Sequence, residues 1–145
     1  MNSRGRNRPE PGAELPGLPA RLATAELVAE FAEASGDRNP LHVNPAAARA
    51  AGHPDVLVHG MLTLGWLAEL VSSWEAVRSI RQLRASFVAP VPAGTRLSVF
   101  GTVTELWETD DGTHASLRLT AHRADGTVTA RGKAIVTLGE VGSAS

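Results

Sequence analysis

The sequence predicts a single α+β domain in which one apolar helix lies across a face of an antiparallel sheet. Residues 60–73 are apolar nearly all round, which is typical of a helix buried on most sides. After Val77 the apolar residues change from helical spacing to alternation. The sequences Asp110-Asp111-Gly112 and Ala124-Asp125-Gly126 then supply hairpin turns between alternating stretches, which favours an antiparallel meander.

The first part of the chain predicts a tail followed by a helix. Residues 1–17 are rich in Arg, Pro, Gly and Glu without apolar periodicity. We expect them to be flexible, because such a segment cannot offset the entropy of ordering. A short strand or lead-in is expected at residues 18–22. Thr24 as N-cap and Glu26 in the first turn then predict a helix over residues 25–34.

The middle of the chain carries further start and stop signals. Residues 35–43 are expected to form a loop. Asn44-Pro45 begins a second helix, with Asn as the cap and Pro at the first helical position. Gly52 ends this helix. Residues 53–58 contain Pro and Asp and are expected to form an extended loop that leads into the apolar helix at Gly60.

Four long antiparallel strands are expected after the apolar helix. The first covers residues 80–88 and is followed by a turn over residues 90–94. The two hairpin turns separate the remaining three strands, which end at Leu138. The domain is therefore expected to span residues 18–138, and residues 139–145 are small and polar enough to form a second flexible tail.

Composition excludes several functional classes. The 145 residues contain no Cys, which removes disulfides, thiolate nucleophiles and Cys-ligated zinc. The net charge of -1 shows no bias toward nucleic acid or anionic membranes. The longest uncharged apolar run, residues 56–68, is shorter than the roughly 18 residues of a membrane span. We expect a cytoplasmic protein with neither a nucleic-acid nor a membrane partner.

The first group of polar residues that suggests chemistry is Asp37, Asn39 and His42. A carboxylate accepts a proton and an imidazole exchanges one near neutral pH, so Asp37 and His42 suit the activation or removal of a water molecule. Asn39 lies between them and is placed to orient either side chain. The same residues are also compatible with a plain turn, because Asp and Asn side chains bond their own backbone.

The second group is His59-Gly60, at the start of the apolar helix. The first N–H groups of a helix have no intrahelical partner and carry partial positive charge, so the Gly60 N–H is a candidate oxyanion donor. His59 and Met61 flank it as candidate substrate-binding residues. The alternative is that His59 caps a buried helix and Gly60 allows tight packing, and the sequence alone leaves both readings open.

The remaining histidines and arginines are weaker candidates. A zinc site from His42, His53 and His59 fits no common ligand spacing, so no metal is expected. His114 and His122 occupy strand positions of the same parity and are expected at the surface or in cross-strand contacts. Three arginines on the first long strand are open to phosphate contact or to plain solvation: Arg78, Arg81 and Arg84.

Three segments resemble one known family. Residues 31–42, FAEASGDRNPLH, with Ala48 six positions beyond, resemble the hydratase 2 motif of the MaoC-like, (R)-specific enoyl-CoA hydratases. Residues 58–61, VHGM, resemble the oxyanion segment of that family. Residues 87–94, FVAPVPAG, resemble its strand and turn. The resemblance covers most of the chain between residues 20 and 138.

The resemblance implies a hot-dog fold, in which an antiparallel sheet wraps around the central helix, and a homodimer with acyl tunnels near its interface. It implies hydration of trans-2-enoyl thioesters, or the reverse dehydration of 3-hydroxyacyl thioesters, without a metal or redox cofactor. Coenzyme A, or the phosphopantetheine of an acyl carrier protein, would be part of the substrate. Asp37 and His42 are then the catalytic pair, Asn39 supports the site, and the Gly60 N–H polarises the thioester carbonyl.

Two other functions stay open for the same fold. A non-catalytic acyl-binding subunit would hold the chain without turnover, but it has no need of both Asp37 and His42. A hot-dog thioesterase would hydrolyse the acyl bond and release a free thiol, whereas hydration leaves the thioester intact. The sequence indicates neither the acyl length nor the carrier nor the physiological direction.

Overall fold

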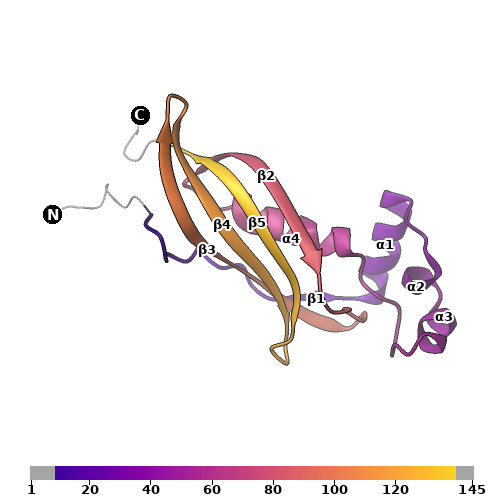
Figure 1. Cartoon of the computed structure of the whole chain (residues 1–145). Coiled ribbons are helices and arrows are strands. Elements are labelled where there is room, and N and C mark those ends of the chain that lie inside the picture. The colour runs from indigo at the N-terminus through magenta and orange to yellow at the C-terminus, as the bar shows by residue number, and fades with distance from the viewer. Residues whose placement is uncertain (1–8, 140–145) are drawn as a thin grey trace.

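The computed structural model describes residues 9–139, which form one five-stranded antiparallel sheet curled around a helix (Figure 1). The central helix, α4, spans Gly60–Ser72. The strands are β1 (Arg21–Ala23), β2 (Val77–Phe87), β3 (Thr95–Thr109), β4 (Gly112–Arg123) and β5 (Val128–Leu138). Their order in the sheet is β1-β3-β4-β5-β2. The predicted α+β layout is confirmed, and the outer parts of the two predicted tails, residues 1–8 and 140–145, lie outside the described residues.

The three-stranded meander β3-β4-β5 follows from its turns. Thr109 pairs with Gly112 across the first turn, where Gly112 has a φ of 117°. Gly126 has a φ of 88° in the turn between β4 and β5. Glycine adopts positive φ at little steric cost, so these two residues allow the chain to reverse tightly. Both predicted hairpins are therefore confirmed.

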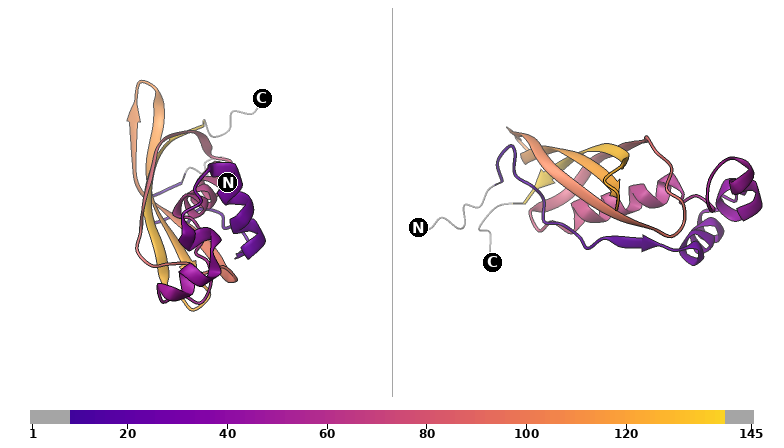
Figure 2. Two further views of the ribbon diagram at one scale, coloured as in Figure 1. Left: turned by 90° about the vertical axis from the view of Figure 1, so that its right-hand side faces the viewer. Right: turned by 90° about the horizontal axis from the view of Figure 1, so that it is seen from below.

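The core lies between α4 and the inner face of the sheet. Leu67 and Leu70 of α4 are completely buried, and so are Leu117, Leu119 and Val136 of the sheet. Figure 2 shows the helices on one side of the sheet. Alternate strand residues point to the opposite face, as the pleat requires. No helix among residues 9–139 is both long and apolar enough to cross a membrane.

The segment before β1 differs from its prediction. The Gly12 N–H donates to the Val103 carbonyl at 2.7 Å, and the Leu15 N–H donates to the Gly101 carbonyl at 2.9 Å. The Leu15 side chain is buried in the core. The prediction of a flexible tail over residues 1–17 is therefore wrong for its second half. Backbone bonds to β3 and a buried leucine offset the entropy of ordering there.

Three short helices separate β1 from α4, and they gather at one end of the molecule (Figures 1 and 2). They are α1 (Ala25–Ser35), α2 (Pro40–Val43) and α3 (Pro45–Ala50). Thr24 caps α1 by accepting the Leu27 N–H at 3.0 Å, and Gly36 ends it with a φ of 81°. The predicted helices at residues 25–34 and after Asn44 are confirmed.

The helix α2 was not predicted, since residues 35–43 were expected to form a loop. Asn39 accepts the Leu41 N–H at 3.0 Å and Pro40 takes the first helical position. This is the same Asn-Pro start signal that begins α3, where Asn44 accepts two backbone N–H groups. A single helical turn has too few residues to show apolar periodicity, so the pattern did not separate it from the expected loop.

His114 in the sheet is buried, whereas its strand position left a surface placement open. His114 of β4 is buried, and its Nδ1 lies 3.2 Å from the Thr137 Oγ1 of the neighbouring strand β5. Its Nε2 lies 2.7 Å from the Thr109 Oγ1. Of the two predicted placements for His114, the cross-strand contact is confirmed and the surface position is wrong.

The two edges of the sheet are unequal. On one side, β3 is partly covered by β1 and by a bridge between Glu14 and Thr102. On the other side, β2 pairs with β5 only, and no strand within residues 9–139 pairs with its second edge. A long strand with unpaired N–H and C=O groups is a template for pairing with another chain.

Candidate active site

The two polar groups of the sequence meet where the short helices approach the start of α4. Asp37 follows the end of α1, His42 lies on α2, and His59 immediately precedes α4. One ligand-capable atom from each of these three side chains lies within 4.8 Å of the others. Residues 22 positions apart in the sequence therefore form one cluster.

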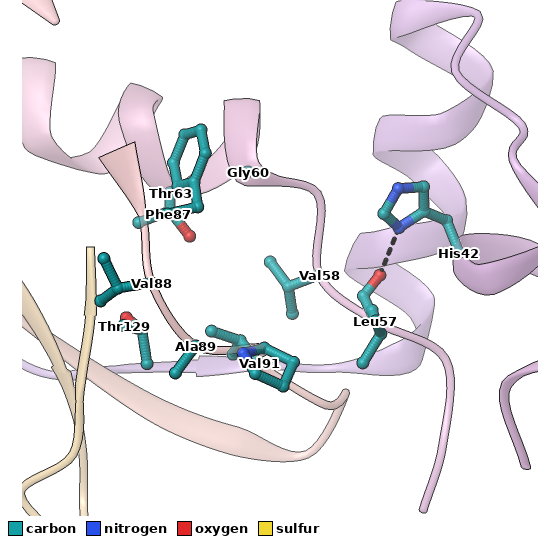
Figure 3. Close-up of a pocket in the computed structure, with 11 residues that line it drawn as sticks. His42, Leu57, Val58, Gly60, Thr63, Phe87, Val88, Ala89, Val91 and Thr129 are labelled. Atoms are coloured by element: carbon teal, nitrogen blue, oxygen red, sulfur yellow. Dashed lines mark hydrogen bonds between the residues drawn. The ribbon is translucent and has the colours of Figure 1, made fainter. Parts of the chain in front are cut away.

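One ring nitrogen of His42 is bonded to the backbone, and the other faces Asp37. Its Nδ1–H donates to the Leu57 carbonyl oxygen at 2.7 Å (Figure 3). This bond leaves Nε2 without a proton in the neutral ring, and Nε2 lies 3.8 Å from the Asp37 Oδ2. The separation is too long for a direct hydrogen bond. A water molecule bonded to both atoms fits it, because such a bridge spans atoms beyond direct bonding distance.

The two carboxylate oxygens of Asp37 face different partners. Its Oδ1 accepts the Asn39 N–H at 3.2 Å, which fixes the turn and leaves Oδ2 to face His42. The side chain of Asp37 is 53% exposed, whereas that of His42 is 17% exposed. The side-chain oxygen of Asn39 caps α2, the helix that carries His42. Asn39 therefore supports the position of His42 through the backbone. A direct role of Asn39 in substrate binding stays a prediction.

His59 contacts both members of the pair. Its Nε2–H donates to the backbone carbonyl of Asp37 at 3.0 Å. Its ring stacks on that of His42, with centroids 3.8 Å apart and planes 18° apart, and Phe31 packs edge-on at 4.8 Å. The side chain is 1% exposed, and its Nδ1 has no hydrogen-bond partner among the described residues. His59 is the N-cap residue of α4, as considered from the sequence, but its side chain makes no capping hydrogen bond.

The cluster contains donor types that bind metal ions, but the arrangement of its two imidazole rings does not suit a shared ion. The rings of His42 and His59 are stacked, so their nitrogen lone pairs lie in nearly parallel planes. Imidazole binds an ion in the plane of its ring, and two stacked rings do not direct their lone pairs to one point. His53, the third residue of the zinc site considered from the sequence, is not part of the cluster.

A pocket of about 360 Å³ opens beside this cluster (Figure 3). His42 and Gly60 line one part of it, and the rest is mostly apolar. Gly60 is the first residue of α4, and its N–H has no hydrogen-bond partner among the described residues. A side chain at this position would place its Cβ 2.8 Å from the Phe87 ring. The glycine therefore allows the Phe87 ring to pack tightly against the start of α4, which is the packing role that the sequence left open.

Three residues that line the pocket were not identified from the sequence, and one predicted substrate-binding residue does not line it. Thr63, Phe87 and Thr129 line the pocket. Thr63 follows Gly60 by three residues, and this helical spacing is the one signal that would have identified it. Thr129 comes from a distant strand and had no such signal. Met61 is 61% exposed and lies outside the pocket lining, so its predicted substrate contact is untested by this geometry.

A family model described as "MaoC like domain" matches residues 7–123. The chain belongs to this family. Its five-stranded sheet around one helix is accordingly the hot-dog fold of MaoC-like hydratases, as predicted. Among solved structures, the (R)-hydratase from A. caviae involved in PHA biosynthesis is 29% identical, with a TM-score of 0.74, and the match covers 92% of this chain and 99% of that one.

Relatives of the MaoC-like chain include larger proteins. The 3-hydroxyacyl-thioester dehydratase Z of Mycobacterium tuberculosis is 30% identical over 96 residues, which cover 62% of this chain and 64% of that protein. The fatty acid synthase subunit beta of Gibberella zeae is 37% identical over 79 residues, or 52% of this chain. The match spans only 4% of the length of that subunit.

Proposed function

We propose that this MaoC-like protein catalyses the reversible, (R)-specific hydration of trans-2-enoyl thioesters. The observation that carries the proposal is the separation of 3.8 Å between the Asp37 Oδ2 and the His42 Nε2, where His42 lines an apolar pocket together with Gly60 at the start of α4. Both atoms are free of other bonds to described residues, and together they can hold one water molecule. The names of the (R)-hydratase and the thioester dehydratase support the same chemistry.

The proposed reaction uses one water molecule for both new bonds. A basic atom of the pair removes a proton from the water, and the hydroxyl oxygen bonds to C3 of the enoyl group. The electrons of the C2–C3 double bond move toward the thioester carbonyl and form an enolate. A proton from the pair then bonds to C2 and the carbonyl is restored. Because both groups can contact the same water molecule, we assign these proton transfers to the pair and not to either residue.

The start of α4 contributes to this reaction through its backbone. The Gly60 N–H and the positive end of the helix are placed to stabilise the enolate oxygen, which carries more charge than the carbonyl of the substrate. The apolar remainder of the pocket, including Val58, Val88 and Val91, suits an acyl chain. In the direction of dehydration the same groups act in reverse.

We also propose that the protein acts as a homodimer. The unpaired edge of β2 ends at Phe87, and this residue and Val88 are large apolar side chains that are about half exposed beside the pocket. A second copy paired along β2 would cover both features and enclose the pocket. Light scattering is expected to give twice the mass of one chain, and a monomer at micromolar concentration would contradict this arrangement.

The activity is tested directly with a short trans-2-enoyl-CoA. The wild-type protein is expected to remove the absorbance of the conjugated enoyl thioester and to yield the (R)-3-hydroxyacyl product, identified by chiral chromatography. A thiol reagent in a parallel sample is expected to detect no free coenzyme A. Racemic 3-hydroxyacyl-CoA supplied as substrate is expected to be dehydrated to no more than half.

The competing functions predict other results in the same experiment. Release of free thiol at the rate of absorbance loss would indicate a thioesterase. Binding of the thioester without loss of absorbance, across several chain lengths and with both coenzyme A and carrier-protein substrates, would indicate an acyl-binding subunit. Either result would overturn the hydratase proposal.

A further inference from the structure

A cluster of basic residues lies on the outer face of the sheet, away from α4. Arg84 of β2 pairs with Lys133 of β5, and Lys133 pairs in turn with Arg118 of β4. Arg131 lies two residues from Lys133 on the same strand and therefore shares its face. Ala130 and Ala134, which flank these cations on β5, are buried in the core, so Arg131 and Lys133 point outward. We call Arg84, Arg118, Arg131 and Lys133 the basic row.

The basic row has no compensating charge among the described residues. All four side chains are exposed, and none of them belongs to an ion pair within residues 9–139. Direct cross-strand neighbours have Cβ atoms about 4.5–5.5 Å apart, and like charges at such positions destabilise a sheet. Packing therefore does not account for three adjacent cations across three strands, whereas a bound polyanion would.

The surface at this place is hollowed. A depression of about 220 Å³ is lined by Arg84, Ser86, Arg131 and Lys133 together with two small residues. Ser86 pairs with Arg131 in the sheet and adds a hydroxyl donor beside the cations. Arginine guanidinium groups bind phosphate through two parallel hydrogen bonds, and lysine adds a compact charge. The depression thus combines the donors that suit a phosphate group.

Two residues of this depression are close in sequence to residues of the active-site pocket. Ser86 immediately precedes Phe87, which lines the pocket. Arg131 follows Thr129, another pocket residue, by two positions, or about 6.6 Å along the strand. Because Ser86 and Phe87 point to opposite faces of β2, the depression and the pocket share no lining residue, but both lie near the end of β2.

We propose that the basic row binds the phosphate groups of coenzyme A while the acyl thioester occupies the active-site pocket. The inference rests on the proposed function, because it takes the substrate to be a thioester. The charges favour coenzyme A over a carrier-protein arm. Coenzyme A carries a diphosphate and a terminal monoester, together about four negative charges, whereas a phosphopantetheine arm has one phosphodiester charge to place against four cations.

The test compares substrates with and without phosphate. The variant Arg84→Gln/Arg131→Gln/Lys133→Gln removes three charges and keeps side chains of similar length. Its KM for a short trans-2-enoyl-CoA is expected to rise at least about tenfold with kcat within about twofold, since several charge-assisted hydrogen bonds are lost remote from the reacting atoms. For the corresponding enoyl pantetheine thioester, which has no phosphate, the KM is expected to stay within about twofold of that of the wild type.

A matched control lies on the same strand. Arg78 is exposed, carries the same charge and lies six residues from Arg84, about 20 Å along β2. Arg78→Gln is expected to leave the KM for both substrates unchanged. A rise that is equal for the phosphate-free thioester would overturn the proposal, and so would an unchanged KM in the triple variant. An equal loss with a carrier-protein substrate would assign the row to a carrier protein instead.

Direct binding separates this inference from the proposed reaction. Titration calorimetry with coenzyme A alone needs no turnover, and the dissociation constant of the triple variant is expected to exceed that of the wild type by at least about tenfold. The difference is expected to shrink at high salt, because the contacts are exposed charges. Equal affinities would overturn the phosphate site whether or not the protein hydrates enoyl thioesters. Tight binding without hydration would contradict only the reaction.

Discussion

Asp37→Asn and His42→Asn are each expected to lower kcat by about 10²–10⁴-fold, because each removes one proton-transfer group from the pair. The substitutions are chosen to keep the structural bonds. Asparagine at position 37 retains an oxygen that can accept the Asn39 N–H. Asparagine at position 42 retains a side-chain N–H near the position of Nδ1, which can donate to the Leu57 carbonyl. The loss is measured as initial rates with a saturating enoyl thioester.

The double variant Asp37→Asn/His42→Asn sharpens this prediction. Two groups that act on the same water molecule lose function as a unit, so the double variant is expected to be no more than about tenfold slower than the worse single variant. Asp55→Asn is the matched control, since Asp55 bonds its neighbouring backbone N–H and lies outside the cluster. A single variant that keeps more than half of the wild-type kcat would show that its residue takes no part in the chemistry.

His59→Phe is expected to lower kcat by about 10–100-fold with KM within about twofold of the wild-type value. Phenylalanine keeps a ring that can stack on His42 but loses the N–H that holds the Asp37 carbonyl. His59 contacts the pair and does not line the pocket, so it acts as a positioning residue. A misplacement of about 1 Å in a reacting group can cost about 10²-fold, which sets the upper end of the expected loss.

His59→Gln distinguishes positioning from a loss of stability. The terminal amide of glutamine can occupy the place of Nε2 and donate to the Asp37 carbonyl, so this variant is expected to recover at least about a third of the wild-type kcat. His53→Gln is the control, because His53 lies on the same loop outside the cluster. Equal kcat in the Phe and Gln variants, or a loss that follows the melting temperature alone, would refute the positioning role.

The order of helices and strands could be predicted from local sequence signals, and the structure contains the same caps and turns. The caps at Thr24 and Asn44, the apolar helix and the two Gly-containing turns each have a short-range physical cause. Asp37, His42 and Gly60 were identified for the same reason, because polar and turn residues stood together in an otherwise apolar part of the chain. His42 and Gly60 line one pocket, and Asp37 lies 3.8 Å from His42, because the loop before α4 folds back over a short distance.

The parts that sequence reasoning missed depend on contacts between distant segments. The role of His59 arises from a ring stack and a bond to a residue 22 positions away, and no local pattern encodes them. Thr129 reaches the pocket from the last strand through sheet pairing alone. The basic row likewise exists only once β2, β4 and β5 are in register, since its four cations are scattered between residues 84 and 133.

The anchoring of α2 also links the proposed reaction to local unfolding. The Leu57 N–H donates to the Leu41 carbonyl at 2.8 Å, and the Leu57 carbonyl accepts the Nδ1–H of His42. Leu57 thus connects α2 to the rest of the fold and fixes the tautomer of the His42 ring. A local opening that breaks this pair of bonds would release the imidazole while the sheet stays intact. The fraction of molecules competent for reaction is then set by that opening equilibrium and not by the global stability of the fold.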